Sequence, residues 1–309
     1  MTNPKVSVVV PTYNASLYIV EALESILSQT FKDFEIIVVD DGSTDNTREI
    51  LKKYNGKINC YFQKNQGAVR ARNSAFELSR GEFIAFLDQD DIWLADNLRK
   101  KVLFLDKNPN VPVVTSNFMF FGDVCQKSSF VERKIFLDKK IGDEFIIFDT
   151  LGLLLEQCFM FCPTTVVRRE VFRKYGGFQI EVSDDYDLFL RISQSSDFGC
   201  INNVLVKKRV HNSAATKNYS KNFSSRILAL KRVKSNPIIG VDRFKKLHKR
   251  MSGTYMSWAS HLISDNKRRE AREKAFLSIG CRLNFASFKI ILLSFGFAYW
   301  LRKKVKYAA

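Results

Sequence analysis

The chain has 309 residues, enough to bury one large hydrophobic core or two smaller ones, and 46% of them are hydrophobic, which is ordinary for a globular protein. Residues 1–200 carry 24 basic and 28 acidic side chains, a net charge of −4, whereas residues 201–309 carry 25 basic and 4 acidic side chains, a net charge of +21. This asymmetry favours contact of the C-terminal third with an anionic membrane surface or with nucleic acid.

The six cysteines show no regular spacing, which excludes a disulfide framework and indicates reduced, mostly buried thiols. Cys158 and Cys162 are four residues apart, but no second Cys or His pair completes a zinc set, so we expect them to pack in the core. The apolar run at the N-terminus is too short for a signal peptide. We therefore expect the protein to stay in the cytoplasm.

Short apolar runs alternate with amphipathic stretches along residues 5–107. The runs KVSVVVP, FEIIVVD, INCYFQ and EFIAFL predict strands, and the stretches between them have the spacing and capping residues of helices. Strands that are apolar on both faces and separated by helices predict an α/β fold with a parallel sheet covered on both sides. From residue 111 to residue 155 the pattern is weaker; VPVVTSNFMFF is strand-like and the rest is irregular.

Polar residues follow three of these predicted strands directly. The first strand ends in PTYN (11–14), the second in DDGS (40–43) and the fourth in DQDD (88–91). Parallel strands end at the same edge of a sheet, where ligands bind, so we expect the three segments to converge there. Crowded carboxylates need a cation, and Mg²⁺ takes one or two of them together with substrate phosphates. The alternative is helix capping, which we expect for Asp91 but which does not account for Asp88.

The glycines of a P-loop or of a dinucleotide-binding loop are absent from the sequence, which leaves a metal diphosphate at an open α/β edge. In this context the chain resembles the family 2 glycosyltransferases. The resemblance rests on five ordered motifs over residues 4–212: VSVVVPTYN, SILSQTFKDFEIIVVDDGSTDNT, NQGAVRARNSAFELSRGEFIAFLDQDD, GGF and SDDYDLFLRI. It implies a GT-A fold, a nucleotide-sugar donor and an inverting mechanism.

The resemblance also implies a role for each matching position. Asp41 would accept a hydrogen bond from uracil N3–H, with Asp40 in support, which suits an acceptor-only carboxylate. The implied metal ligands for Mg²⁺ or Mn²⁺ are Asp88, Asp90 and His211, with Asp90 the more direct one. The residues implied to bind the nucleotide sugar are Pro11, Thr12, Tyr13, Asp40, Asp41, Asn65, Arg72, Asp88 and Gln89.

Asp185, in SDDYDLFLRI, is implied to be the catalytic base. Inversion needs one base that takes the proton of the acceptor hydroxyl while the metal stabilises the departing diphosphate. The family usually has Glu-Asp where this chain has Asp184-Asp185, so the choice between the two stays open, and either could instead cap the following helix. His211 could equally have a structural role.

Beyond residue 220 the sequence predicts basic helices at 220–236, 241–264, 267–280 and 284–304. The last has about 17 mostly apolar residues followed by RKKVK, shorter than the roughly 20 residues that span a bilayer. A helix lying in the membrane interface, with Tyr299 and Trp300 near the headgroups, and a helix packed on the main domain both fit this pattern. We expect a catalytic domain at 1–215 and a basic helical region at 216–309.

The sequence thus predicts a transferase at the cytoplasmic face of a membrane, acting on a glycan or lipid-linked saccharide. Two alternatives remain. A sugar nucleotidyltransferase would need a glycine-rich basic loop after the first strand, which PTYNASLYI lacks. A non-catalytic binder could use the basic segment to hold nucleic acid, but no nucleic-acid-reading module is recognisable, so we expect no nucleic-acid partner.

Overall fold

The computed structural model describes residues 3–122, 142–179, 185–211, 219–235 and 239–294. The chain divides into two compact units. The N-terminal unit comprises Met1–Leu151 and Cys158–Ala214, and the C-terminal unit comprises Gly152–Gln157 and Ala215–Ala309.

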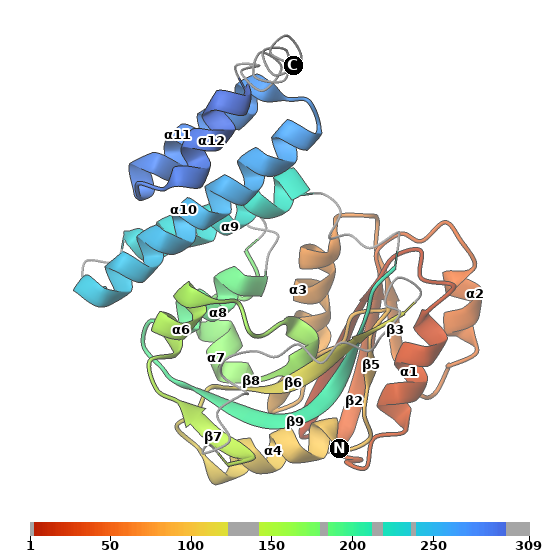
Figure 1. Cartoon of the computed structure of the whole chain (residues 1–309). Coiled ribbons are helices and arrows are strands. Elements are labelled where there is room, and N and C mark those ends of the chain that lie inside the picture. Colours follow the sequence, from red (N-terminus) through yellow and green to blue (C-terminus); the bar gives the residue numbers. More distant parts are fainter. Residues whose placement is uncertain (1–2, 123–141, 180–184, 212–218, 236–238, 295–309) are drawn as a thin grey trace. The chain divides into compact units, whose positions relative to one another are not determined.

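A nine-stranded sheet forms the centre of the N-terminal unit (Figure 1). Its strands run in the order β3-β2-β1-β4-β8-β6-β9-β5, and β7 pairs with β9. The four strands β3, β2, β1 and β4 are mutually parallel, whereas β8 is antiparallel to both its neighbours and β6 is parallel to β9. The strands are β1 (Val6–Thr12), β2 (Phe34–Asp40), β3 (Asn59–Phe62), β4 (Phe83–Phe86), β5 (Ile92–Trp93), β6 (Val113–Phe121), β7 (Glu144–Ile147), β8 (Thr165–Arg168) and β9 (Phe198–Arg209).

Helices cover both faces of this sheet, as the two-sided apolar strands require. Val6, Val8 and Val10 of β1 belong to a core that includes side chains of α1, α2 and α4. On the opposite face, the rings of Phe86 and Phe172 pack together with those of two further phenylalanines, from α3 and from the turn after α7. The helices of this unit are α1 (Ile19–Leu27), α2 (Thr47–Lys52), α3 (Ala68–Leu78), α4 (Asn97–Lys107), α6 (Thr150–Glu156, divided between the units), α7 (Arg169–Lys174) and α8 (Asp185–Ser193). The predicted α/β class is confirmed.

Among the described elements, β5, β7 and α6 have no clear pattern in the sequence. The first is only two residues long, and the other two lie in the stretch of weak pattern. Local periodicity cannot reveal β5, because it forms only where Ile92 and Trp93 pair antiparallel with Lys207 and Val206 of β9.

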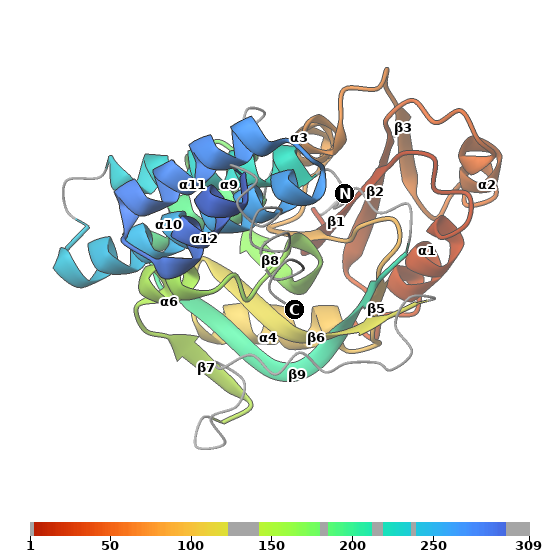
Figure 2. The same cartoon turned by 45° about the horizontal axis from the view of Figure 1, so that its top comes forward.

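The C-terminal unit is helical, as predicted. Its helices are α9 (Tyr219–Lys234), α10 (Val241–Ser264), α11 (Arg268–Cys281) and α12 (Phe285–Ser294), and Figure 2 shows them from a second direction. The last predicted helix, 284–304, begins as α12, and its remainder, including Tyr299 and Trp300, lies outside the described residues. Among the described residues, no helix has both the length and the apolar character needed to cross a membrane.

Candidate active site

The polar segments after β1, β2 and β4 meet at the carboxyl ends of these parallel strands, which we call this edge of the sheet. Thr12 at the end of β1 lies beside Asp40 at the end of β2. The Tyr13 N–H donates to Gln89 Oε1 at 2.7 Å, and Gln89 Nε2 donates back to the Tyr13 carbonyl at 3.1 Å. Gln89 therefore fixes the backbone after β1 to the turn after β4. Pro11 and Thr12 are buried, whereas 44% of Tyr13 is exposed, so its ring is accessible to a ligand.

Asp40 is fully buried and is bonded within the segment that follows it. Its Oδ1 accepts hydrogen bonds from the backbone N–H of Ser43, at 3.0 Å, and from the Ser43 hydroxyl. Its Oδ2 accepts one from Arg48 Nε at 2.8 Å. These three bonds satisfy the buried carboxylate and shape the turn after β2, and a role of Asp40 in donor binding stays a prediction.

Asp41 anchors the segment after β3. Its Oδ1 accepts from Gln63 Nε2 at 2.7 Å and from the Gln66 N–H at 2.8 Å, and its Oδ2 accepts from the Gly67 N–H at 2.7 Å. A carboxylate offers about four acceptor positions. About one acceptor position therefore remains for a ligand, and recognition of a base by Asp41 stays a prediction. The three bonds also give Asp41 a structural role.

A pocket of about 450 Å³ adjoins this carboxylate pair and is lined in part by Asn65. Gly42 lines it too, with a φ of +82°, and a Cβ there would lie 2.9 Å from the Asn65 nitrogen. Only glycine permits both this backbone conformation and this close approach. On another wall the Arg48 guanidinium lies 5.1 Å from the centre of the Phe62 ring.

Asp88 is held between two cations. Its Oδ1 lies 2.6 Å from Arg72 Nη2, its Oδ2 lies 4.0 Å from Lys208 Nζ, and the side chains of Asp88 and Arg72 are only 24% and 16% exposed. Burial by itself would raise the pKa of Asp88, but the charges of Arg72 and Lys208 outweigh it and hold the pKa below its ordinary value. A role of Asp88 as metal ligand stays a prediction, because both of its oxygens face cations of the protein.

Asp90 and His211 lie together although 120 residues separate them in sequence. Asp90 Oδ2 is 2.7 Å from His211 Nε2, and the His211 ring packs against Tyr18 with 4.8 Å between ring centres. Carboxylate oxygens are ordinary ligands of Mg²⁺ and Mn²⁺, whereas imidazole is a less usual partner of these ions. Among the described residues no group of three or more His, Cys, Asp or Glu side chains could hold a metal ion. A cation at this pair would therefore take its other ligands from phosphate oxygens or water.

Asp91 does not cap the following helix, so that prediction is wrong. Helix α4 begins at Asn97, and its N-cap residue is Asp96. Asp91 is instead buried beside β9, where it accepts from the Arg209 N–H at 2.9 Å and lies 3.3 Å from Lys208 Nζ. Burial raises the pKa of Asp91 to about 7, with the neighbouring carboxylates contributing and Lys208 opposing the shift.

Asp185 is the first residue of α8, and its Oδ2 accepts a hydrogen bond from the Cys162 N–H at 2.8 Å. The Cys162 thiol is also hydrogen-bonded to Asp185, and burial followed by the charge of Asp185 raises the pKa of that thiol. Asp88 raises it further and Arg72 opposes the shift, so Cys162, Asp185, Arg72 and Asp88 form one electrostatic cluster. Asp184, the alternative base, lies outside the described residues.

Two further motifs hold α8 in place. In the GGF turn, Asn73 of α3 donates to the Phe178 carbonyl at 2.8 Å and accepts from the Phe178 N–H at 3.1 Å. Arg191 of α8 donates to the Gly177 carbonyl at 2.6 Å and pairs with Asp187 at 2.8 Å. The conformation of this turn thus links α3, which carries Arg72, to α8, which carries Asp185.

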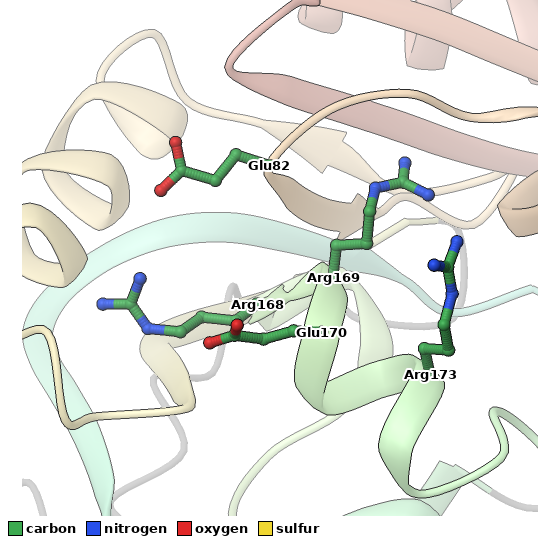
Figure 3. Close-up of a pocket in the computed structure, with 5 residues that line it drawn as sticks. All are labelled: Glu82, Arg168, Arg169, Glu170 and Arg173. Carbon is green, nitrogen blue, oxygen red and sulfur yellow. The ribbon is translucent and has the colours of Figure 1, made fainter.

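A second pocket, of about 270 Å³, lies beside the start of β4 and the end of β8 (Figure 3). Glu82, just before β4, and Arg168, at the end of β8, line it. Arg168 donates to three backbone carbonyls at the end of α4, and Arg169 donates to the Gly81 carbonyl and to the Ser79 hydroxyl. These two guanidiniums are engaged in holding loops together, which indicates a structural role.

Sequence reasoning missed Lys208 and Cys162. Lys208 lies in a strand, LVKKRV, whose two lysines alternate in direction, and no local feature tells which one faces the carboxylates. Cys162 was expected only to pack. Its backbone lies in the short turn Cys162–Thr164, which is fixed by a hydrogen bond from Trp93 Nε1 to the Pro163 carbonyl at 2.9 Å.

Comparison with family models and with curated proteins identifies the family of this chain. The model of glycosyl transferase family 2 matches residues 7–176. An uncharacterized glycosyltransferase of Rickettsia typhi is 33% identical over 69% of this chain and 66% of its own length, so the match spans about two thirds of that relative. The UDP-Glc:alpha-D-GlcNAc-diphosphoundecaprenol beta-1,3-glucosyltransferase WfgD of Escherichia coli is 33% identical over 64% of this chain and 73% of its own length.

Comparison with solved structures supports the same fold. The 1-349 fragment of S. aureus TarS in complex with UDP-GlcNAc superposes with a TM-score of 0.70 at 20% identity, over 90% of this chain and 81% of that fragment. The mannosyltransferase PcManGT from Pyrobaculum calidifontis, in complex with GDP-Man and Mn²⁺, superposes with a TM-score of 0.61 at 19% identity, over 97% of this chain and 81% of its own. The GT-A fold resemblance is confirmed, and this chain belongs to glycosyl transferase family 2.

Proposed function

We propose that the chain is an inverting, metal-dependent transferase that moves a sugar from a UDP-sugar to a lipid-linked saccharide or glycan in cell-surface polysaccharide biosynthesis. The observation that carries this proposal is the arrangement of carboxylates: the Asp90–His211 pair and the Asp88–Arg72–Cys162–Asp185 cluster share one edge of the sheet. The Asp90–His211 pair can hold a metal diphosphate, and Asp185 of the cluster can accept a proton. These are the two requirements of inverting transfer.

Asp185 is the proposed base. The acceptor hydroxyl oxygen attacks C1 of the sugar, the bond from C1 to the diphosphate oxygen breaks, and the Asp185 carboxylate takes the hydroxyl proton. The Cys162 N–H holds Oδ2 at 2.8 Å, which fixes the orientation of the carboxylate. Only one catalytic carboxylate is needed, unlike the pair in a glycosidase.

Donor binding is proposed for the loops after β1, β2 and β3. Pro11, Thr12 and Tyr13 would hold the base, Asp41 would accept from it and Asp40 would support that loop. Asn65, Arg72, Asp88 and Gln89 would contact or position the ribose and diphosphate. Asp90 and His211, together with Asp88 if Arg72 releases it, would hold Mg²⁺ or Mn²⁺. When bound, the cation would neutralise charge that builds on the leaving diphosphate.

The acceptor and the place of action are inferred from a relative. WfgD, by its name, uses a UDP-sugar and a diphosphoundecaprenol acceptor. A lipid-linked acceptor requires the enzyme to reach a membrane surface, and the +21 charge of residues 201–309 favours the anionic cytoplasmic leaflet. We therefore propose peripheral association with that leaflet.

The experiment combines transfer with stereochemistry. The protein is incubated with UDP-glucose or UDP-GlcNAc, Mn²⁺ and a GlcNAc-diphosphate-lipid acceptor, and the product linkage is assigned by NMR. The proposal expects a β-linked product from these α-linked donors. It also expects near-complete loss of transfer in Asp185→Asn and ordinary transfer in Asp143→Asn, an exposed carboxylate in the N-terminal unit. A retained α configuration would contradict the inverting mechanism.

A further inference from the structure

Helix α12 presents polar residues inward and apolar residues outward. The buried residues Ser287, Ile290 and Ser294 recur at helical spacing and are two serines and one isoleucine. A second set with the same spacing, Phe285, Phe288 and Leu292, is 92%, 48% and 54% exposed. A helix on the surface of a globular protein normally has the opposite arrangement.

Hydrogen bonds attach this helix to its neighbours, in addition to a small apolar cluster of Ile290 with Ala259 and Ala275. Ser287 Oγ donates to Ser278 Oγ of α11 at 2.9 Å, and Ser278 Oγ donates to the Ser252 carbonyl of α10 at 2.8 Å. Asn284, just before α12, donates to both the Ser252 and the Ser278 hydroxyls at 3.1 Å. The network fixes the rotation of α12, so the apolar face is held outward by structure.

Other apolar residues of the same helical hairpin are exposed as well. Phe276 and Leu277 of α11 and Leu283 in the connection between the helices are also largely exposed. Together with Phe285, Phe288 and Leu292 they form what we call the α11–α12 apolar face. Small polar residues between helices and apolar side chains outside are the arrangement found where helices meet lipid. Exposed apolar sets of this kind mark sites of association.

The charges at this face favour an anionic lipid surface over a second copy of the chain as its partner. Arg282 and Lys289 are exposed within the same segment, and the region 201–309 carries a net charge of +21. A second copy of the chain would bring the same positive charge and be repelled, whereas an anionic lipid surface would attract it. The chain beyond Ser294 has the sequence FGFAYWLRKKVKYAA, again apolar and basic.

We infer that the α11–α12 apolar face is the surface with which the protein docks on an anionic lipid bilayer, with Phe285 and Phe288 entering the acyl boundary and Arg282 and Lys289 at the headgroups. This docking surface would bring the proposed enzyme to its lipid-linked acceptor. It rests on the proposed function only because that function supplies the reason for membrane binding. The proposed contact is an interfacial one, with the helix lying in the plane of the bilayer surface.

The test is co-sedimentation of the full chain with vesicles of phosphatidylcholine and phosphatidylglycerol in equal parts, compared with phosphatidylcholine alone. The inference expects binding to the anionic vesicles. In the double variant Phe285→Ser/Phe288→Ser binding falls about tenfold or more, since each ring loses its burial in lipid. Arg282→Glu/Lys289→Glu weakens binding by a similar factor, and does so only on the anionic vesicles. Phe148→Ser, which changes an exposed phenylalanine of the N-terminal unit, leaves binding unchanged.

Three results would overturn the inference: no vesicle binding by the full chain, binding that the Phe285→Ser/Phe288→Ser variant retains, or a dimer that this variant converts to a monomer. Circular dichroism verifies that the variants remain folded. Hydrolysis of UDP-sugar is measured in parallel without lipid. Absence of vesicle binding by the wild-type chain with donor hydrolysis intact rejects the docking surface alone, whereas absent hydrolysis with intact vesicle binding rejects the proposed function alone.

Discussion

Lys101 offers a quantitative test of how the N-terminal unit is stabilised. It lies on α4, is fully buried, and donates to Asn97 Oδ1 at 2.6 Å. Burial lowers the pKa of Lys101 well below 10.5, and only the Cys200 thiol acts in the other direction. The folded protein therefore holds Lys101 neutral at pH values where the unfolded chain holds it protonated.

The sign of the pH dependence follows directly. Between the lowered pKa of folded Lys101 and 10.5, unfolding takes up one proton at this site, so the free energy of unfolding rises with pH. The expected slope is about 1.4 kcal/mol per pH unit. Lys101→Met removes this contribution, so the difference between the wild type and the variant should change by about 1.4 kcal/mol per unit in the wild type's favour as pH rises.

The assay is urea unfolding followed by tryptophan fluorescence between pH 7 and 10. Replacement of Trp258 and Trp300 by Phe leaves Trp93 as the only tryptophan, so the signal reports on the N-terminal unit. Lys107→Met, an exposed lysine at the end of the same helix, is the matched control and should show no such difference. A Lys101→Met variant whose stability parallels the wild type at every pH would refute the reasoning, because Lys101 would then be charged in the folded state.

Two further changes test the site. Arg72→Met removes one partner of the partly buried pair with Asp88 and should lower the free energy of unfolding by about 2 kcal/mol. The control is Arg70→Met at an exposed position, which should change the free energy of unfolding by no more than about 0.5 kcal/mol. Equal effects of the two variants in urea unfolding would refute a stabilising role of the Arg72–Asp88 pair. Gln89→Ala removes both hydrogen bonds to the Tyr13 backbone. It should lower kcat/KM for the donor about tenfold while the urea midpoint of unfolding stays unchanged. Unchanged kinetics would show that the loop after β1 keeps its position without Gln89.

Much of the sheet edge could be predicted from local sequence. Val6–Thr12 and Phe34–Asp40 are apolar on both faces, which identifies parallel strands, and parallel strands bring their carboxyl ends together. The convergence of Tyr13 with Gln89 followed from that rule. The pairing of Asp90 with His211 was expected only through the resemblance, because no local pattern links positions so far apart.

The unpredicted features depend on tertiary pairing. The approach of the half-buried Lys208 to Asp91 follows from the register of β9 against β5, and that register is set by contacts distant in sequence. Lys101 stands in the basic run Arg99–Lys101, which is typical of a solvated helix face, yet it is fully buried. In both cases tertiary packing overrides a pattern that composition alone would place in water.

The most direct test of the proposed catalysis is a donor-binding and turnover measurement on three proteins. UDP-glucose, UDP-GlcNAc and GDP-mannose are titrated calorimetrically with Mn²⁺ or with EDTA, and hydrolysis of the same donors is followed. The account predicts that the wild type binds a UDP-sugar only with metal, that Asp90→Ala loses this binding, and that Asp185→Asn binds normally but does not turn over. Tight metal-independent binding, or full turnover by Asp185→Asn, would contradict it.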